Sequence, residues 1–415
     1  MDELELKGSH AKRAAFEAAA LSESEKNKAL ERVCVELKDQ ASFVLEQNAR
    51  DLEGARSSGS ADAFLDRLAL NPKRIQEMVD GLEQLILLPD PVGEIIGSWR
   101  LENGLSIRKQ RVPIGVIGII YEARPNVTLD AAALCLKAGN AVVLRGSSSA
   151  QLTNLALVAV IREALSKAGL PIDLAQIIED PSRDVVKRFL KLKSYLDVVI
   201  PRGGAELIRF TVENATVPVL ETGAGNCHIY IDQGADYDMA ARIVLNAKTQ
   251  RPAVCNTAET LLVHKDWAGE HLQALLQALS AAGVECRCCE RSQALVPGAR
   301  SATEKDWETE FLDLILAVRV VESLEEAIAH VNRYGTRHSE AIVTNSAKAA
   351  ERFMQGVDAA AIYHNASTRF TDGFVFGFGA EIGISTQKLH ARGPMGLTEL
   401  TTYKYLVSGV GQIRS

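Results

Sequence analysis

The sequence lacks the features that mark several classes of protein. Aromatic residues make up only 5% of its 415 residues, and apolar runs such as Gly115–Ile120 are far shorter than the ~18 residues of a membrane-spanning helix. The acidic start, Met1–Glu5, has neither the basic nor the apolar part of a signal peptide. Basic residues are also in deficit, since 46 Lys and Arg against 53 Asp and Glu give a net charge of −7. We therefore expect neither a membrane protein nor one that binds nucleic acid through its overall field.

Cysteine is scarce and odd in number. Seven cysteines in a long chain favour free thiols in a reducing cytoplasm over a disulfide framework. Cys286, Cys288 and Cys289 lie together, but no second pair and no neighbouring His pair completes the spacing of a zinc site. We therefore predict a cytoplasmic protein without a metal site.

The remaining composition, 47% hydrophobic and 24% charged, is that of a globular chain with two or three domains. Helical periodicity covers Ala11–Ser58, where Ser22 and Glu25 have the spacing of a capping box. After Pro113, apolar runs alternate with helical patterns. This alternation predicts βαβ units and parallel, doubly wound sheets.

The predicted strands form two series, with a boundary near Glu221–Asp232. The first series comprises Gly115–Ile120, Ala141–Arg145, Leu174–Ile178 and Leu196–Ile200. The second comprises Thr260–His264, Leu314–Val321, Ala341–Thr344 and Ala361–His364. Predicted helices between them include Leu129–Lys137, Leu152–Lys167, Val185–Leu192, Leu324–Asn332 and Ala347–Met354. Outside both series, the patterns of Trp99–Arg111 and Thr401–Val410 predict a small β extension, for which we expect a role as a dimer contact.

Three segments are candidates for chemistry. Gly146–Ser149 and Pro201–Gly204 each follow a predicted strand, where backbone N–H groups at a helix start can hold phosphate. Neither matches a dinucleotide or P-loop fingerprint, so ordinary βα turns are the alternative. Cys255 follows Arg251 and Pro252 in a predicted turn, a setting that lowers a thiol pKa and makes a nucleophile. The alternative is an inert, buried cysteine.

Four motifs together carry a resemblance that covers Ala11–Lys404. They are Tyr121–Val127, Gln250–Thr257, Asn365–Gly373 and Gly379–Leu397. With the segment Ala327–Ile342, they resemble the gamma-glutamyl phosphate reductases, a family of the aldehyde dehydrogenase superfamily. The resemblance implies an aldehyde dehydrogenase-like α/β fold with two doubly wound α/β domains and a small β oligomerisation element. We assign residues 1–225 to a nucleotide-binding domain interrupted near 99–112, 226–395 to a catalytic domain, and 99–112 with 396–415 to the oligomerisation element.

The reaction implied by this resemblance is the reduction of L-glutamate 5-phosphate by NADPH to L-glutamate 5-semialdehyde, in proline biosynthesis. Cys255 would attack the acyl phosphate and release phosphate, and hydride would reduce the resulting thioester. Asn126 and the backbone N–H of Cys255 would stabilise the oxyanion, although an Asn after Pro125 also suits a turn. Glu221 matches the general base of hydrolytic members. Three other interpretations of Glu221 stay open, namely a proton shuttle, an evolutionary relic or a structural carboxylate.

The resemblance also assigns cofactor contacts. No carboxylate stands at Ser147 or Ser148, with Arg145 close by, which suits the 2′-phosphate of NADP better than the ribose of NAD. Further residues are expected at the pyrophosphate or the nicotinamide end, and they are Arg202, Gly203, Gly204 and Glu310. A solvated acidic turn is the alternative for the last of these.

The substrate has two anionic ends, which need cationic partners. The resemblance places five polar residues at the substrate, with the pairing of arginines and anions left open. They are Arg124, Arg251, Asn365, Ser367 and Arg369. A homo-oligomer is expected, and a contact with the glutamate kinase that makes the substrate is a further hypothesis.

Two rival functions remain. A general aldehyde dehydrogenase would oxidise an aldehyde to an acid with water. A non-catalytic binding protein would keep the fold without the chemistry. A general aldehyde dehydrogenase would reduce NADP⁺ without phosphate, whereas the reductase would require it. Loss of turnover with intact nucleotide binding in Cys255→Ser would distinguish the enzyme from a binding protein.

Overall fold

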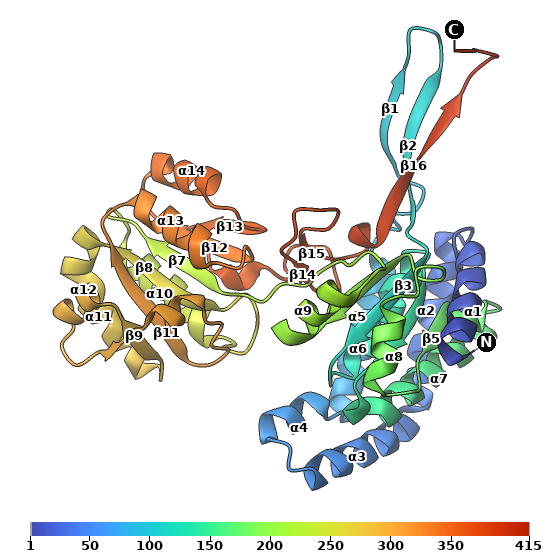
Figure 1. Ribbon diagram of the computed structural model, residues 1–415, viewed down its shortest axis with the longest axis horizontal. Helices are drawn as coiled ribbons and strands as arrows, with labels where there is room; N and C mark the ends of the chain where they lie inside the picture. The colour runs from blue at the N-terminus through green and yellow to red at the C-terminus, as the bar shows by residue number, and fades with distance from the viewer. Residues whose placement is uncertain (1, 415) are drawn as a thin grey trace. The chain divides into compact units, whose positions relative to one another are not determined.

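The computed structural model describes residues 2–414, which divide into two compact units (Figure 1). The first contains the chain up to Glu221 together with Gly377–Gly383 and the segment from Met395 onward. The second contains Thr222–Phe376 and Ile384–Pro394. Among the described residues, no helix has the length and apolar character needed to cross a membrane. The functional roles expected for the two domains remain predictions.

A four-stranded parallel sheet forms the centre of the first unit. Its strands lie in the order β5 (Ala175–Ile177), β4 (Ala141–Arg145), β3 (Val116–Tyr121) and β6 (Val198–Arg202). Every residue of β3 is buried, which explains its continuous apolar sequence. The strand order reverses between β3 and β6, and ligands of doubly wound sheets bind at the carboxyl ends beside such a point.

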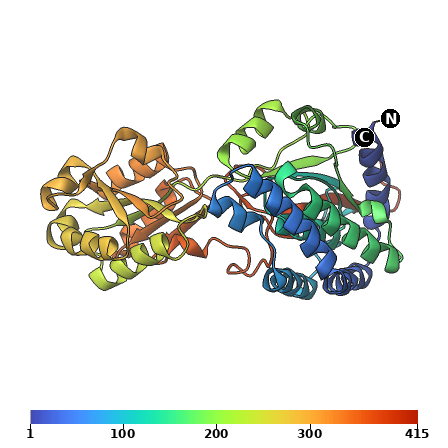
Figure 2. The same cartoon turned by 90° about the horizontal axis from the view of Figure 1, so that it is seen from below.

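Helices cover this sheet and form an additional N-terminal layer. The helices that follow its strands are α6 (Asn126–Lys137), α7 (Gln151–Lys167), α8 (Arg183–Phe189) and α9 (Ala205–Asn214). The N-terminal layer comprises α1 (Glu3–Ala18), α2 (Glu23–Asp39), α3 (Ala41–Ser57), α4 (Asp62–Leu68) and α5 (Pro72–Leu87). Of these, α2 and α3 pack against α7 (Figure 2). The predicted capping box is formed: the Glu25 N–H donates to Ser22 Oγ over 3.3 Å, and the Ser22 N–H donates back over 2.8 Å.

A seven-stranded parallel sheet forms the second unit. Its order is β10-β9-β11-β8-β7-β12-β13. The strands are β7 (Cys227–Ile231), β8 (Ala258–His264), β9 (Glu285–Cys288), β10 (Arg300–Ser301), β11 (Ile315–Val321), β12 (Ser339–Val343) and β13 (Ala361–His364). The helices are α10 (Tyr237–Thr249), α11 (Lys265–Ala281), α12 (Glu290–Leu295), α13 (Leu324–Tyr334) and α14 (Ala347–Gly356). Two short strands, β14 (Ile384–Ser385) and β15 (Gly393–Pro394), pair separately.

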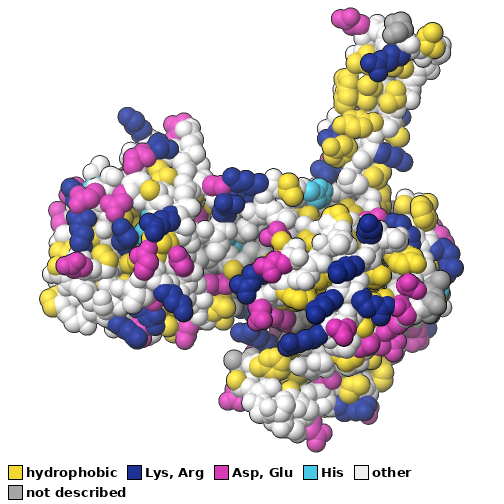
Figure 3. All heavy atoms as spheres, in the orientation of Figure 1, with side chains coloured by type: hydrophobic (Ala, Val, Ile, Leu, Met, Phe, Trp, Pro, Cys, Tyr) yellow, Lys and Arg dark blue, Asp and Glu magenta, His cyan; other side chains and the backbone are white. Residues whose placement is uncertain are grey.

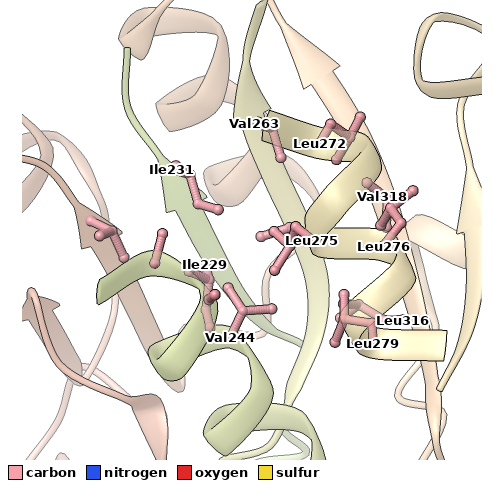
Figure 4. Close-up of a cluster of buried hydrophobic side chains, with 14 of the residues drawn as sticks. Ile229, Ile231, Val244, Val263, Leu272, Leu275, Leu276, Leu279, Leu316 and Val318 are labelled. Atoms are coloured by element: carbon pink, nitrogen blue, oxygen red, sulfur yellow. The ribbon is translucent and has the colours of Figure 1, made fainter. Parts of the chain in front are cut away.

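Both faces of this larger sheet are buried. On one face Ile229 and Val263 pack with Leu275 of α11, as Figure 4 shows. On the other face Tyr230 packs with Phe353 of α14. Successive strand residues therefore contribute to opposite cores, as expected of a sheet covered by helices on both sides.

The predicted alternation of strands and helices is confirmed, and each of the eight predicted strands exists to within about two residues at either end. The sequence reading missed β9, since the charged Glu285 and Arg287 interrupt its apolar pattern. It also began α6 too late. That helix begins at Asn126, directly after Pro125, where proline's fixed φ favours a helix start.

The predicted β extension is a three-stranded antiparallel arm of the first unit. It consists of β1 (Ile95–Arg100), β2 (Ser106–Pro113) and β16 (Thr401–Ser408), with β2 in the middle. The arm projects from the rest of that unit (Figure 1), and hydrophobic side chains are exposed along it (Figure 3). These exposed side chains are Ile95, Ile96, Trp99, Tyr403, Tyr405 and Val407. So much exposed apolar surface on a thin sheet is typical of an interface.

Candidate active site

Cys255 lies in the turn between α10 and β8, where its side chain is partly exposed. Its carbonyl oxygen is tightly packed. A Cβ added at Gly225 would lie 1.3 Å from that oxygen, so only glycine fits there. The buried Cys227 Sγ donates to the same oxygen over 3.2 Å, and burial raises the pKa of Cys227 well above its usual value. Cys227 therefore remains a protonated donor, and the backbone of Cys255 is held in place.

The third motif holds the other side of the turn. The buried Asn256 donates from Nδ2 to the carbonyl of Thr371 over 2.8 Å. Thr368 Oγ1 donates to the carbonyl of Asn256 over 2.7 Å. Thr257 Oγ1 closes the turn onto the carbonyl of Arg251 over 2.7 Å. Two motifs more than 100 residues apart in sequence therefore form one hydrogen-bonded structure around Cys255.

Two arginines lie beside this turn. Arg369 donates from Nε to Gln250 Oε1 over 3.1 Å. Burial, followed by the charge of Arg251, lowers the pKa of Arg369, whereas a negative charge on Cys255 would raise it. Arg251 and Cys255 therefore both lie within electrostatic range of Arg369. Two positive charges beside the turn favour an anionic ligand.

Two predicted substrate contacts have structural partners of their own. Asn365 has a positive φ of 56°, and its amide bonds the backbone N–H and carbonyl of Thr344 over 2.9 and 3.0 Å. The buried Ser367 accepts the Arg369 N–H over 3.3 Å. Both side chains shape the loop after β13, and their contact with substrate remains a prediction.

Glu310 has a role that the sequence did not indicate. Its Oε1 accepts the N–H of Gly225 over 2.7 Å, so this carboxylate holds the glycine that packs on the nucleophile. The loop after Glu310 is fixed in turn by a buried ion pair. Lys248 Nζ lies 2.6 Å from Glu259 Oε2, and Glu259 Oε1 accepts the N–H of Leu312. Lys248 belongs to α10 and Glu259 to β8, the two elements that flank the nucleophile's turn.

In the first unit, Asn126 is exposed at the start of α6 and donates from Nδ2 to Asp130 Oδ2 over 3.1 Å. Burial raises the pKa of Asp130 to about 6, against the lowering effects of Asn126 and of the positive Arg202. Arg124 lies exposed just before the same helix. The sequence reading missed Asp130, although its spacing of four residues from Asn126 would place both on one helix face.

A shallow hollow lies at the carboxyl ends of β4 and β5. Its lining includes Gly146, Ser147, Ser148, Gln151, Asn154 and Glu179. A Cβ at Gly146 would lie 2.2 Å from Asn154 Nδ2, and that buried nitrogen has no hydrogen-bond partner among the described residues. Glu179 carries a negative charge into this lining, but Lys7 Nζ lies 2.8 Å from it. A buried donor without a partner and a neutralised acid are features that suit a polar ligand.

Arg145 and Gly204 are already engaged. Arg145 donates from Nη2 to the carbonyl of Pro181 over 2.5 Å, which directs it toward the loop after β5. The N–H of Gly204, at the start of α9, donates to Glu122 Oε2 over 3.2 Å. The first N–H of α9 therefore already bonds the carboxylate of Glu122, and phosphate binding at this turn stays a prediction.

Comparison with known proteins identifies the family. The model of the aldehyde dehydrogenase family matches residues 9–293. A gamma-glutamyl phosphate reductase of Moorella thermoacetica is 59% identical over 99% of both chains, and one of Caldicellulosiruptor bescii is 55% identical over the whole of both. The chain belongs to the gamma-glutamyl phosphate reductase family.

Solved structures agree with this assignment. The crystal structure of a gamma-glutamyl phosphate reductase from Thermotoga maritima covers all of both chains with a TM-score of 0.98 and 51% identity. An acetylating aldehyde dehydrogenase from Geobacillus thermoglucosidasius, at 18% identity and a TM-score of 0.70, shares the fold. The aldehyde dehydrogenase-like fold is thereby confirmed, and the family implies a nicotinamide cofactor. Among residues 2–414, no cluster of His, Cys, Asp and Glu has the arrangement of a metal site.

Proposed function

We propose that this protein reduces L-glutamate 5-phosphate to L-glutamate 5-semialdehyde with NADPH, releasing phosphate, in proline biosynthesis. The observation that carries the proposal is the hydrogen-bonded turn that presents Cys255 beside two arginines, in a chain 59% identical to a gamma-glutamyl phosphate reductase. Relatives of this name favour the reductase over a general aldehyde dehydrogenase.

Cys255 acts as the nucleophile. Its thiolate bonds to the acyl carbon, and the phosphate leaves with the electron pair of the broken C–O bond. Arg251 and Arg369 favour the thiolate and bind the anionic groups of the substrate, with Arg124 as a third candidate. The product is a thioester on Cys255, which accepts hydride more readily than an oxygen ester.

The tetrahedral intermediates carry a negative oxygen, which needs preorganised donors. We assign this role to the amide of Asn126 and to the backbone N–H of Cys255. After hydride transfer, the thiohemiacetal collapses by breaking its C–S bond, and the thiolate of Cys255 is regenerated.

The cofactor is NADP, for which the hollow after β4 is the proposed adenosine site. Ser147 and Ser148, which line this hollow, would lie nearest the 2′-phosphate. Four residues outside the hollow would lie toward the pyrophosphate and the nicotinamide, and they are Arg202, Gly203, Gly204 and Glu310. When bound, NADPH supplies the hydride. The residues present suit this group, since the Asn154 amide that packs on Gly146 has no hydrogen-bond partner among the described residues and Lys7 offsets the charge of Glu179.

The arm is proposed as the interface of a homo-oligomer, because burying its apolar side chains against another chain would remove them from water. Contact with a glutamate kinase and a cytoplasmic location both stay predictions.

The decisive experiment runs the reaction backward. With L-glutamate 5-semialdehyde and NADP⁺, we expect NADPH formation only when inorganic phosphate is present, because phosphate is the group that resolves the thioester. Sulfate at equal ionic strength is the control. Equal rates with and without phosphate would identify a hydrolytic aldehyde dehydrogenase instead.

A further inference from the structure

Among the described residues, the side-chain amide of Asn126 donates a hydrogen bond to a carboxylate on its own helix. Its Nδ2 donates to Asp130 Oδ2 over 3.1 Å, one helical turn further along α6. An ionised carboxylate can only accept hydrogen bonds. It therefore selects the orientation in which the amide presents its NH₂ group. The opposite orientation would turn the carbonyl oxygen toward the carboxylate and bring two acceptors together.

Orientation matters because only one end of an amide can stabilise an oxyanion. The NH₂ group has two hydrogens, and the bond to Asp130 uses one of them. The second hydrogen remains for a ligand. A flipped amide would instead present an oxygen to the developing negative charge, which is repulsive.

From these contacts we propose that Asp130 is a positioning residue, which orients the Asn126 amide so that its free N–H stabilises the oxyanion. This inference rests on the proposed function and adds a residue to it. Asp130 touches neither substrate nor cofactor in this account and acts through Asn126 alone.

The electrostatic surroundings support a carboxylate with this purpose. Asp130 is partly buried, and burial raises its pKa to about 6, so at pH 7 it is held as an anion in a place that disfavours the charge. Arg202, at the end of β6, provides the compensating positive field. A carboxylate that served only to stabilise the helix would gain nothing from a partly buried position that disfavours its charge.

The chain contains a matched control for an ordinary helix contact. On α5, Gln76 Nε2 donates to Asp80 Oδ1 over 2.7 Å, with the same spacing of four residues. Both of these side chains are exposed. Such a pair on a helix surface contributes only a few tenths of a kcal/mol.

The test measures kcat and KM of the phosphate-dependent reverse reaction for Asp130→Leu, Asp130→Asn and Asp80→Leu. We expect Asp130→Leu to lower kcat about 10- to 100-fold with KM changed less than about threefold, because a misdirected donor weakens mainly the transition state. Asp130→Asn keeps the shape of the side chain, but an amide can donate as well as accept, so it no longer selects one orientation of the Asn126 amide. We therefore expect a smaller loss of kcat than in Asp130→Leu. The melting temperature of Asp130→Asn at pH 7 should be no lower than that of the parent. Asp80→Leu should retain the parent kcat.

A double-mutant cycle decides whether Asp130 acts through Asn126. In an Asn126→Ala background, the change at Asp130 should have no further effect on kcat. Equal losses in both backgrounds, or a parent-like kcat in Asp130→Leu, would overturn the inference. If Asp130→Leu fails to fold, Asp130→Asn replaces it in the cycle, with a threefold loss of kcat as the threshold.

The proposed function is judged separately. Phosphate-dependent activity in the parent, lost in Cys255→Ser, supports it whatever Asp130 does. A parent without that activity overturns both the function and this inference.

Discussion

The two regions that carry the proposed chemistry are held in different ways. Around Cys255, buried hydrogen bonds from β7 and from the loop after β13 fix the backbone on both sides. Asn126 and Ser148 are exposed at the carboxyl ends of strands, and the helix that follows Ser148 is held by a distant segment, since the Thr153 N–H donates to Asp51 Oδ2 over 2.8 Å. The difference teaches that buried hydrogen bonds enclose the backbone of the nucleophile, whereas the side chains proposed for the oxyanion and the nucleotide are exposed.

Removing the nucleophile is the strongest test of this contrast. Cys255→Ser should lower turnover by at least ~10³-fold, because a serine hydroxyl is a far weaker nucleophile without a dedicated base. The measurement is phosphate-dependent NADP⁺ reduction. Cys289→Ser is the matched control, since that partly exposed thiol lies beside Ser292 and away from the proposed chemistry. Substantial turnover in Cys255→Ser would contradict the assignment.

The second test addresses the interior that supports the turn. Glu259→Gln leaves Lys248 buried without a counter-charge, and breaking such a pair costs ~3–5 kcal/mol. Urea unfolding at pH 7 should show a clearly lowered midpoint. Glu285→Gln is the control, because its partners Arg287 and Arg300 form solvent-accessible ion pairs. Similar midpoints for the two variants would show that the buried pair does not support the turn.

The third test disturbs the packing against the nucleophile. Gly225→Ala introduces a Cβ where the carbonyl oxygen of Cys255 lies, so the turn must shift by about an ångström. We expect kcat/KM to fall ~10- to 100-fold. Gly234→Ala, at a position with no atom within 4 Å, should behave as the parent. A parent-like Gly225→Ala would mean that the turn tolerates displacement.

The smallest expected effect concerns the nucleotide end. Ser148→Glu places a carboxylate where the 2′-phosphate is proposed to bind, and like-charge repulsion should shift the ratio of kcat/KM for NADPH over NADH downward by ~10-fold or more. Ser148→Gln, of equal length but neutral, should shift it much less. An unchanged ratio in Ser148→Glu would place the 2′-phosphate elsewhere.

The fold could be predicted from the sequence because each helix and strand has its own local pattern of apolar residues and capping residues. The buried strands β3 and β4 are continuous apolar runs, and the capping box at Ser22 is a local arrangement of hydrogen bonds. The strand β9 escaped prediction, since its charged residues form ion pairs that no local pattern reveals.

The site was predictable only in part. The motif around Cys255 identified a nucleophile, but the bond from Glu310 to Gly225 joins residues 85 positions apart. Asp130 could have been found from helical spacing alone, whereas the buried Lys248 and Glu259 required knowledge of which side chains share an interior.

The sequence by itself determined the alternation of strands and helices, the family motifs and the identity of the reactive thiol, because these depend on residue type and local spacing. Only the tertiary structure decided that Gly225, Cys227 and Thr371 enclose the turn of Cys255. The physical reason is that buried hydrogen bonds and close packing join segments whose proximity arises only when the sheets assemble.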